Sequence, residues 1–253
     1  MRGATLLALL ATVAALSPAW AGDPLRTTLE VGPRHNIDAV LYTPDRPGPF
    51  PGILLLPTSR GFNVADDGYC RKLALENYIC LAADYERAHG DTGAMRGFSF
   101  GKDAEAIQMD LVAVRAEMQS LPKIRPDSIG TIGFSNGGYF AIWLAATHQT
   151  RASVAYYPAL GQVSNAPRLG RLEDNFSSAS APLLILHGTT DHIPVAAVQN
   201  VEKAMTAAGA PHEVKIYQYA GHEFERDFSQ PGNQAAAADA WPRTLAFFKR
   251  YLQ

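Results

Sequence analysis

The stretch that decides the fold runs from residue 128 to 138 and reads Ser-Ile-Gly-Thr-Ile-Gly-Phe-Ser-Asn-Gly-Gly. Its first half predicts a buried strand, and the apolar run that continues to residue 147 predicts a helix. Between them lies Gly-x-Ser-x-Gly, the pattern of a strained strand-to-helix turn that lifts a serine hydroxyl above the edge of a sheet. Glycine is required at 133 and 137, because side chains there would collide across the turn. The context predicts that Ser135 is a nucleophile rather than part of a purely structural turn.

Working outward, strands and helices alternate along the chain. Apolar runs predict strands at 36–42, 52–57, 78–84, 128–134, 153–157, 182–187 and 213–219. Apolar spacings of 4, 3, 4 and 3 predict a helix over 107–121, and others are expected at 66–76, 137–147, 195–208 and 235–252. Pro242 is expected to kink or restart the last helix. This order predicts an α/β fold with a mostly parallel, doubly wound sheet and helices on both faces. Segment 158–181 has room for only a small cap, so no large lid is expected.

The N-terminal residues differ from the rest. Arg2 precedes an apolar run over 4–16, and Ala19-Trp20-Ala21 supplies a small-x-small cleavage pattern. This layout predicts a signal peptide over 1–21, and therefore a secreted or periplasmic protein. The run is too short for a membrane anchor, so none is expected after cleavage. Residues 22–253 are long enough for one domain.

The overall charge points to a small-molecule partner. The formal net charge is −2, with acidic and basic residues interspersed, which argues against a nucleic-acid surface. The sequence does not indicate the oligomeric state.

Cys70 and Cys80 are the two cysteines of the chain. An oxidising compartment permits a disulfide bridge between them, and the alternative is that they are two small buried apolar side chains.

A serine nucleophile needs a base and a carboxylate that orients it. His222 lies in a loop directly after the last predicted strand, where sites of open α/β sheets assemble. Asp191 follows the strand at 182–187 and comes between Ser135 and His222, the chain order expected of this scaffold. A helix N-cap before Pro194 is the alternative role for Asp191. Asp174 is the nearest rival carboxylate and has no strand before it.

The oxyanion of such a reaction is expected to be held by two backbone N–H groups. One belongs to Asn136, directly after the nucleophile, and the other to the loop after strand 52–57, where we favour Ser59. The mechanism requires no metal and no organic cofactor.

The chain resembles the dienelactone hydrolase family of α/β-hydrolases. The resemblance covers about 52–252 and rests on G-F-S-N-G-G at 133–138, H-G-T-T-D-H-I-P-V at 187–195, G-H-E-F at 221–224 and A-W-P-R-T-L-A-F-F at 240–248. The members that give the family its name carry Cys at the elbow and a Glu where Thr58 stands here. The resemblance therefore implies a serine carboxylesterase, with dienelactone hydrolysis or a prolyl-oligopeptidase-like peptidase as alternatives and an inactive binding protein as a remote one.

The same resemblance implies two arginines that bind a substrate carboxylate. Arg226, four residues after His222, matches the family position well, and Arg87 matches it less closely. The alternative is that both are ordinary surface arginines.

Overall fold

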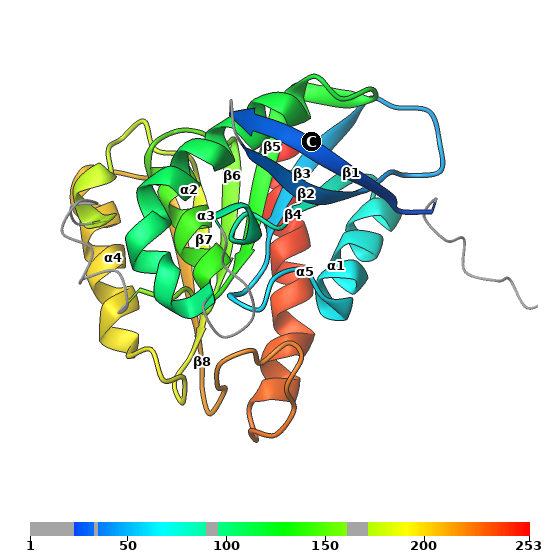
Figure 1. The fold of residues 1–253 in the computed structure, drawn as a ribbon. Helices are drawn as coiled ribbons and strands as arrows, with labels where there is room; N and C mark the ends of the chain where they lie inside the picture. The colour runs from blue at the N-terminus through cyan, green and yellow to red at the C-terminus, as the bar shows by residue number, and fades with distance from the viewer. Residues whose placement is uncertain (1–22, 33–34, 90–95, 161–171) are drawn as a thin grey trace, which may run out of the picture.

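A computed structural model describes residues 23–32, 35–89, 96–160 and 172–253 (Figure 1). The predicted signal peptide lies outside these ranges, and so do residues 161–171 of the segment expected to form a small cap. Within them, no helix is both long enough and apolar enough to cross a membrane.

The described strands form one sheet of eight, in the order β1-β2-β4-β3-β5-β6-β7-β8. Their bounds are Leu25–Gly32, His35–Tyr42, Phe50–Leu56, Ile79–Ala83, Ile124–Phe134, Ala152–Tyr156, Leu183–Gly188 and His212–Tyr217, numbered β1 to β8 in chain order. β2 pairs antiparallel with β1 and β4. All the other pairings, which run across the sheet in the order β4-β3-β5-β6-β7-β8, are parallel. The predicted mostly parallel sheet is confirmed.

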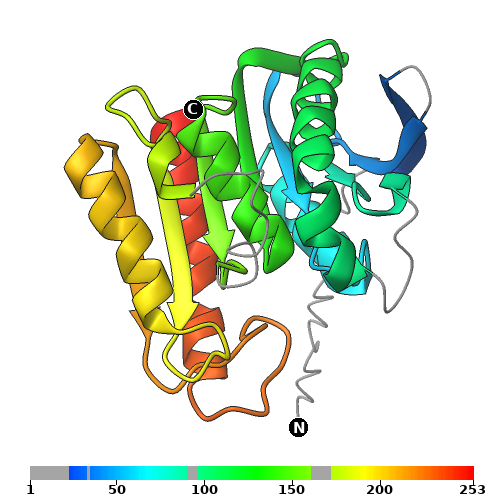
Figure 2. The ribbon, with the colours of Figure 1, turned by 60° about the vertical axis from the view of Figure 1, so that its left-hand side comes forward.

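Among the described residues, five α-helices cover the two faces of this sheet (Figures 1 and 2). They are α1 (Val64–Leu75), α2 (Arg96–Gln119), α3 (Asn136–Ala146), α4 (Val195–Ala208) and α5 (Asn233–Leu252). Apolar side chains of α2, α3 and α4 belong to one buried cluster, and those of α1 and α5 to a second cluster on the opposite face. Because strand side chains alternate between faces, one sheet supplies both clusters. Helices on both faces were expected and are confirmed.

Apart from shifts of up to four residues at the ends of other elements, three elements differ from the sequence-based expectation. The exposed edge strand β1 was not predicted. α2 begins at Arg96, eleven residues before the first residue of the apolar spacing, although Ile107, Leu111 and Val114 are fully buried as that spacing requires. α5 extends from Asn233 to Leu252 with Pro242 inside it, so the expected restart does not occur, whereas the alternative of a kink stays a prediction.

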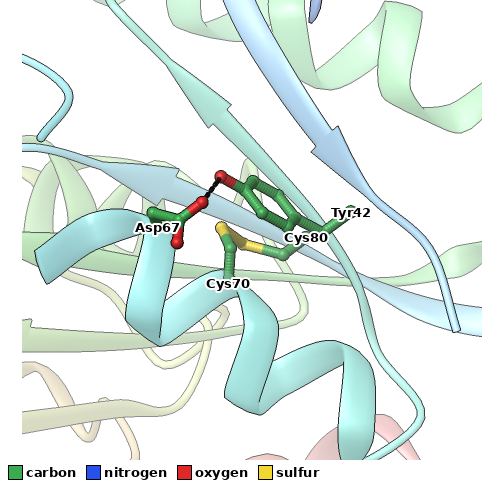
Figure 3. Close-up of a disulfide and its surroundings, with 4 residues drawn as sticks. All are labelled: Tyr42, Asp67, Cys70 and Cys80. Atoms are coloured by element: carbon green, nitrogen blue, oxygen red, sulfur yellow. Dashed lines mark hydrogen bonds between the residues drawn. A yellow bond between two sulfur atoms is a disulfide. The ribbon is translucent and has the colours of Figure 1, made fainter. Parts of the chain in front are cut away.

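The two cysteines form a disulfide that joins α1 to β4 (Figure 3). Cys70 and Cys80 lie 5.3 Å apart between Cα atoms, and both are fully buried. Beside the bridge, the Tyr42 hydroxyl of β2 donates a hydrogen bond of 2.6 Å to Asp67 of α1. α1 is therefore tied both covalently and by a hydrogen bond to the half of the sheet that carries the antiparallel strands.

Candidate active site

The turn at Ser135 has the backbone of a nucleophile elbow. β5 ends at Phe134 and α3 begins at Asn136, which leaves Ser135 between them with φ 53° and ψ −111°. This is a conformation that non-glycine residues rarely adopt. A Cβ on Gly133 would lie 2.0 Å from the Gly137 oxygen, and one on Gly137 would lie 2.2 Å from the Leu56 oxygen. The two glycines therefore allow β5, α3 and the end of β3 to meet around the serine.

The structure brings Ser135, His222 and Asp191 into one hydrogen-bonded chain. The distance from Ser135 Oγ to His222 Nε2 is 3.0 Å, and that from His222 Nδ1 to Asp191 Oδ2 is 2.8 Å. The three residues follow β5, β8 and β7, whose carboxyl ends lie at the same edge of the sheet (Figure 2). Since an Nδ1 facing a carboxylate carries the proton, Nε2 of His222 is left to accept the proton of the serine hydroxyl.

Asp191 is held as a carboxylate although its side chain is fully buried. Burial acts to raise its pKa. A hydrogen bond from His222, the charge interaction with His222 and a hydrogen bond from the Ile193 backbone N–H together outweigh burial, so the pKa is lowered. The Ile193 N–H donates to Asp191 Oδ1 over 2.8 Å. His187 lies behind this group, with Nε2 donating to the Ile193 carbonyl over 2.9 Å, and burial lowers the pKa of its imidazole. His187 is therefore neutral and holds the turn that carries Asp191.

A buried charged network, not predicted from the sequence, lies on the other side of His222. The ring of Tyr157 packs against the imidazole with centroids 4.7 Å apart, and its hydroxyl donates to Glu225 over 2.5 Å. Arg226 donates to Glu225 over 2.5 Å and lies 3.5 Å from Asp66 of α1. Burial raises the pKa of Glu225, and it raises that of Asp66 to about 6 despite the nearby Arg226. Two buried carboxylates thus share one guanidinium.

The two arginines expected to meet a substrate carboxylate lie in different places. Arg226 belongs to the network just described and covers the ring of Phe134 at 5.1 Å. Arg87 is well exposed, with its guanidinium 3.8 Å from Asp84. It lines a cavity of about 460 Å³ together with residues of β1 and β2, and none of the three hydrogen-bonded residues lines that cavity.

The two amides expected to hold an oxyanion lie on neighbouring segments. Asn136 opens α3, so its N–H has no acceptor within the helix. Its side-chain amide donates to the buried carboxylate of Glu86 over 3.0 Å. Ser59 lies in the turn after β3, where the Gly61 N–H donates to the Thr58 carbonyl over 2.9 Å. The close approach of Gly137 to Leu56 brings this turn beside the start of α3.

Comparison with known proteins identifies the family. The dienelactone hydrolase family model matches residues 37–252. The chain belongs to the dienelactone hydrolase family. A Methylorubrum extorquens protein, provisionally named a carboxymethylenebutenolidase, is 31% identical over 226 residues, which cover 85% of this chain and 77% of the relative.

Solved structures agree with this assignment. A provisionally assigned dienelactone hydrolase of Klebsiella pneumoniae superposes with a TM-score of 0.75 at 26% identity, covering 90% of this chain and 100% of that one. An acylaminoacyl peptidase of Pyrococcus horikoshii shares the fold, with a TM-score of 0.71 at 15% identity, but this chain covers only 41% of it. The chain is therefore a hydrolase with the α/β-hydrolase fold.

Proposed function

We propose that this family member hydrolyses carboxylic esters through an acyl-enzyme formed on Ser135. The observation that carries the proposal is the unbroken path from Ser135 Oγ through both nitrogens of His222 to Asp191. His222 takes the proton of the Ser135 hydroxyl as the oxygen attacks the ester carbonyl. The imidazolium then returns that proton to the leaving alcohol. In the second half, His222 activates a water that cleaves the acyl-enzyme and frees the carboxylic acid.

The oxyanion of each tetrahedral intermediate is proposed to be held by the N–H groups of Asn136 and Ser59. Their neighbouring positions, at the start of α3 and in the turn after β3, support this assignment. One such donor typically contributes about 3 kcal/mol to stabilisation of the transition state. Glu86 supports the arrangement, because its bond to the Asn136 side chain fixes the first residue of the helix.

Arg226 and Arg87 are left outside the proposed substrate site. Arg226 is already neutralised by Glu225 and Asp66, so a substrate carboxylate would have to compete with two buried partners. Arg87 faces a cavity formed with β1 and β2. The substrate in this proposal is therefore a carboxylic ester, with no anionic group required.

We also propose that residues 1–21 are a cleaved signal peptide and that 22–253 act outside the cytoplasm as a single domain. The Cys70–Cys80 bridge supports this, because disulfides persist in oxidising compartments.

The direct test is rapid-mixing kinetics with a p-nitrophenyl ester. An acyl-enzyme predicts a burst of p-nitrophenol equal to the enzyme concentration, and Ser135→Ala should abolish the burst and lower kcat by a factor on the order of a million. Peptide anilides of the same acyl groups distinguish an esterase from a peptidase. Full turnover by Ser135→Ala would exclude Ser135 as the nucleophile.

A further inference from the structure

A second imidazole lies against the proposed triad and takes no part in its mechanism. His192 follows Asp191 directly, and its ring centroid lies 4.4 Å from that of His222. We propose that Asp191, His192 and His222 form a site for a zinc-type transition-metal ion, and that the bound ion switches the hydrolase off. The loss of activity rests on the proposed function, whereas the metal site itself does not.

The donor atoms already lie near the spacing of a metal site. Asp191 Oδ1 is 3.0 Å from His222 Nδ1 and 3.3 Å from His192 Nδ1, and one ligand atom from each of the three residues falls within 4.8 Å of the others. With bonds of about 2.05 Å, a tetrahedral zinc ion needs its ligands about 3.3 Å apart. The two imidazoles must move closer together to reach this spacing, and His192 can make this movement because its side chain is 60% exposed.

The exposure of the three side chains defines how the ion enters. His222 is 20% exposed, and Asp191 is fully buried. An ion therefore arrives on the solvent side at His192, and a water completes its coordination. Two imidazoles and one carboxylate suit Zn²⁺, Cu²⁺ and Ni²⁺, whereas Mg²⁺ and Ca²⁺ prefer sites built mainly from oxygen ligands.

Inhibition follows from the atoms that the ion occupies. Coordination through Nδ1 uses the lone pair of that nitrogen, so the single proton of the neutral His222 ring moves from Nδ1 to Nε2, and the ion takes over the Asp191 oxygen that accepts the Nδ1 proton in the triad. Nε2 then carries the ring proton and has no lone pair with which to accept a second one. Ser135 then has no proton acceptor, although the fold is unchanged.

The test compares zinc inhibition of p-nitrophenyl ester hydrolysis in wild type, His192→Gln and His212→Gln. His212 begins β8, at the opposite end of that strand from the His222 loop, and serves as the matched control. Wild type and His212→Gln should lose activity at the same zinc concentration and recover it with EDTA, and magnesium should have no effect. His192→Gln should keep its turnover without metal and require at least about 10-fold more zinc.

A second measurement does not depend on turnover. Co²⁺ added to Ser135→Ala should give one equivalent of a tetrahedral visible absorption band, and this band should be lost when His192→Gln is added to that variant. Equal zinc sensitivity of wild type and His192→Gln, no inhibition by millimolar zinc, or no cobalt band would overturn the metal site. Absence of ester turnover in metal-free wild type, with the cobalt band present, would instead reject the proposed function alone.

Discussion

Replacing Asp66 by Asn should change how stability depends on pH. The Asp66 side chain is fully buried; it accepts a 3.0 Å hydrogen bond from the Asn63 amide and faces Arg226 at 3.5 Å, with Glu225 beyond. Burial is the largest influence and raises its pKa from 3.8 to about 6, partly opposed by Arg226 and Asn63. Between these two pH values the folded protein keeps a proton that the unfolded chain has lost.

The sign and size of the effect follow from proton linkage. Because the folded state binds the extra proton, the free energy of unfolding falls as pH rises from about 4 to about 6. Each pH unit is worth about 1.4 kcal/mol, so the interval from 3.8 to about 6 corresponds to about 3 kcal/mol. Asp66→Asn cannot ionise and loses this dependence. As pH rises from 4 to 7, the free energy of unfolding of Asp66→Asn should therefore increase by about 3 kcal/mol relative to that of wild type.

The assay is urea unfolding followed by tryptophan fluorescence at half-unit steps from pH 4 to 7.5. The matched control is Asp67→Asn, one residue along α1. Burial acts to raise the pKa of Asp67, but its hydrogen bonds with Arg71 and Tyr42 outweigh burial and lower it. The stabilisation that ionised Asp67 provides is fully present at pH values above the ordinary pKa of Asp. The difference in free energy of unfolding between wild type and Asp67→Asn should therefore stay constant above pH 5. A constant difference for Asp66→Asn as well would refute the reasoning.

Three further predictions test the turn, the triad and the disulfide. Gly137→Ala should destabilise the fold by about 1–3 kcal/mol and lower kcat, because its Cβ would lie 2.2 Å from the Leu56 oxygen; wild-type urea stability would contradict the steric argument. Asp191→Asn should lower kcat by a factor on the order of 10⁴ while the circular dichroism spectrum is retained, and a loss below tenfold would argue against its orienting role. Replacing Cys70 and Cys80 by Ala should cost about 3 kcal/mol for this ten-residue separation, and dithiothreitol should destabilise wild type but not the variant.

Elements with a strong apolar pattern could be predicted from the sequence, and those without one could not. α4 begins and ends at the predicted residues, and β7 is displaced by one residue from the predicted 182–187. Central strands and packed helices can be recognised in the sequence because both are apolar over most of their length. β1 pairs only with β2 at the edge of the sheet, and Leu29 is its only buried side chain among those described, so its local signal is weak.

The candidate site likewise contains residues that the sequence predicts and residues that it does not. Ser135, Asp191 and His222 each follow a predicted strand in a known order, and the structure brings them within hydrogen-bonding distance. Asp66 carries no such signal, because an acidic residue in the first turn of a helix is ordinary on electrostatic grounds. Its partner Arg226 is 160 residues away, so only the folded chain reveals their contact.

The three proposed catalytic groups follow three separate strands, which has a consequence for incomplete molecules. The nucleophile is contributed at residue 135, whereas its base arrives at residue 222, after the last strand of the sheet. A chain that lacks β8 and the residues after it, because synthesis stalled or the C-terminal fragment was lost after proteolysis, would keep a serine that nothing can activate. Only molecules whose final strand has packed onto the sheet would then hydrolyse esters. The rate of ester turnover would therefore measure the fraction of chains that have folded completely.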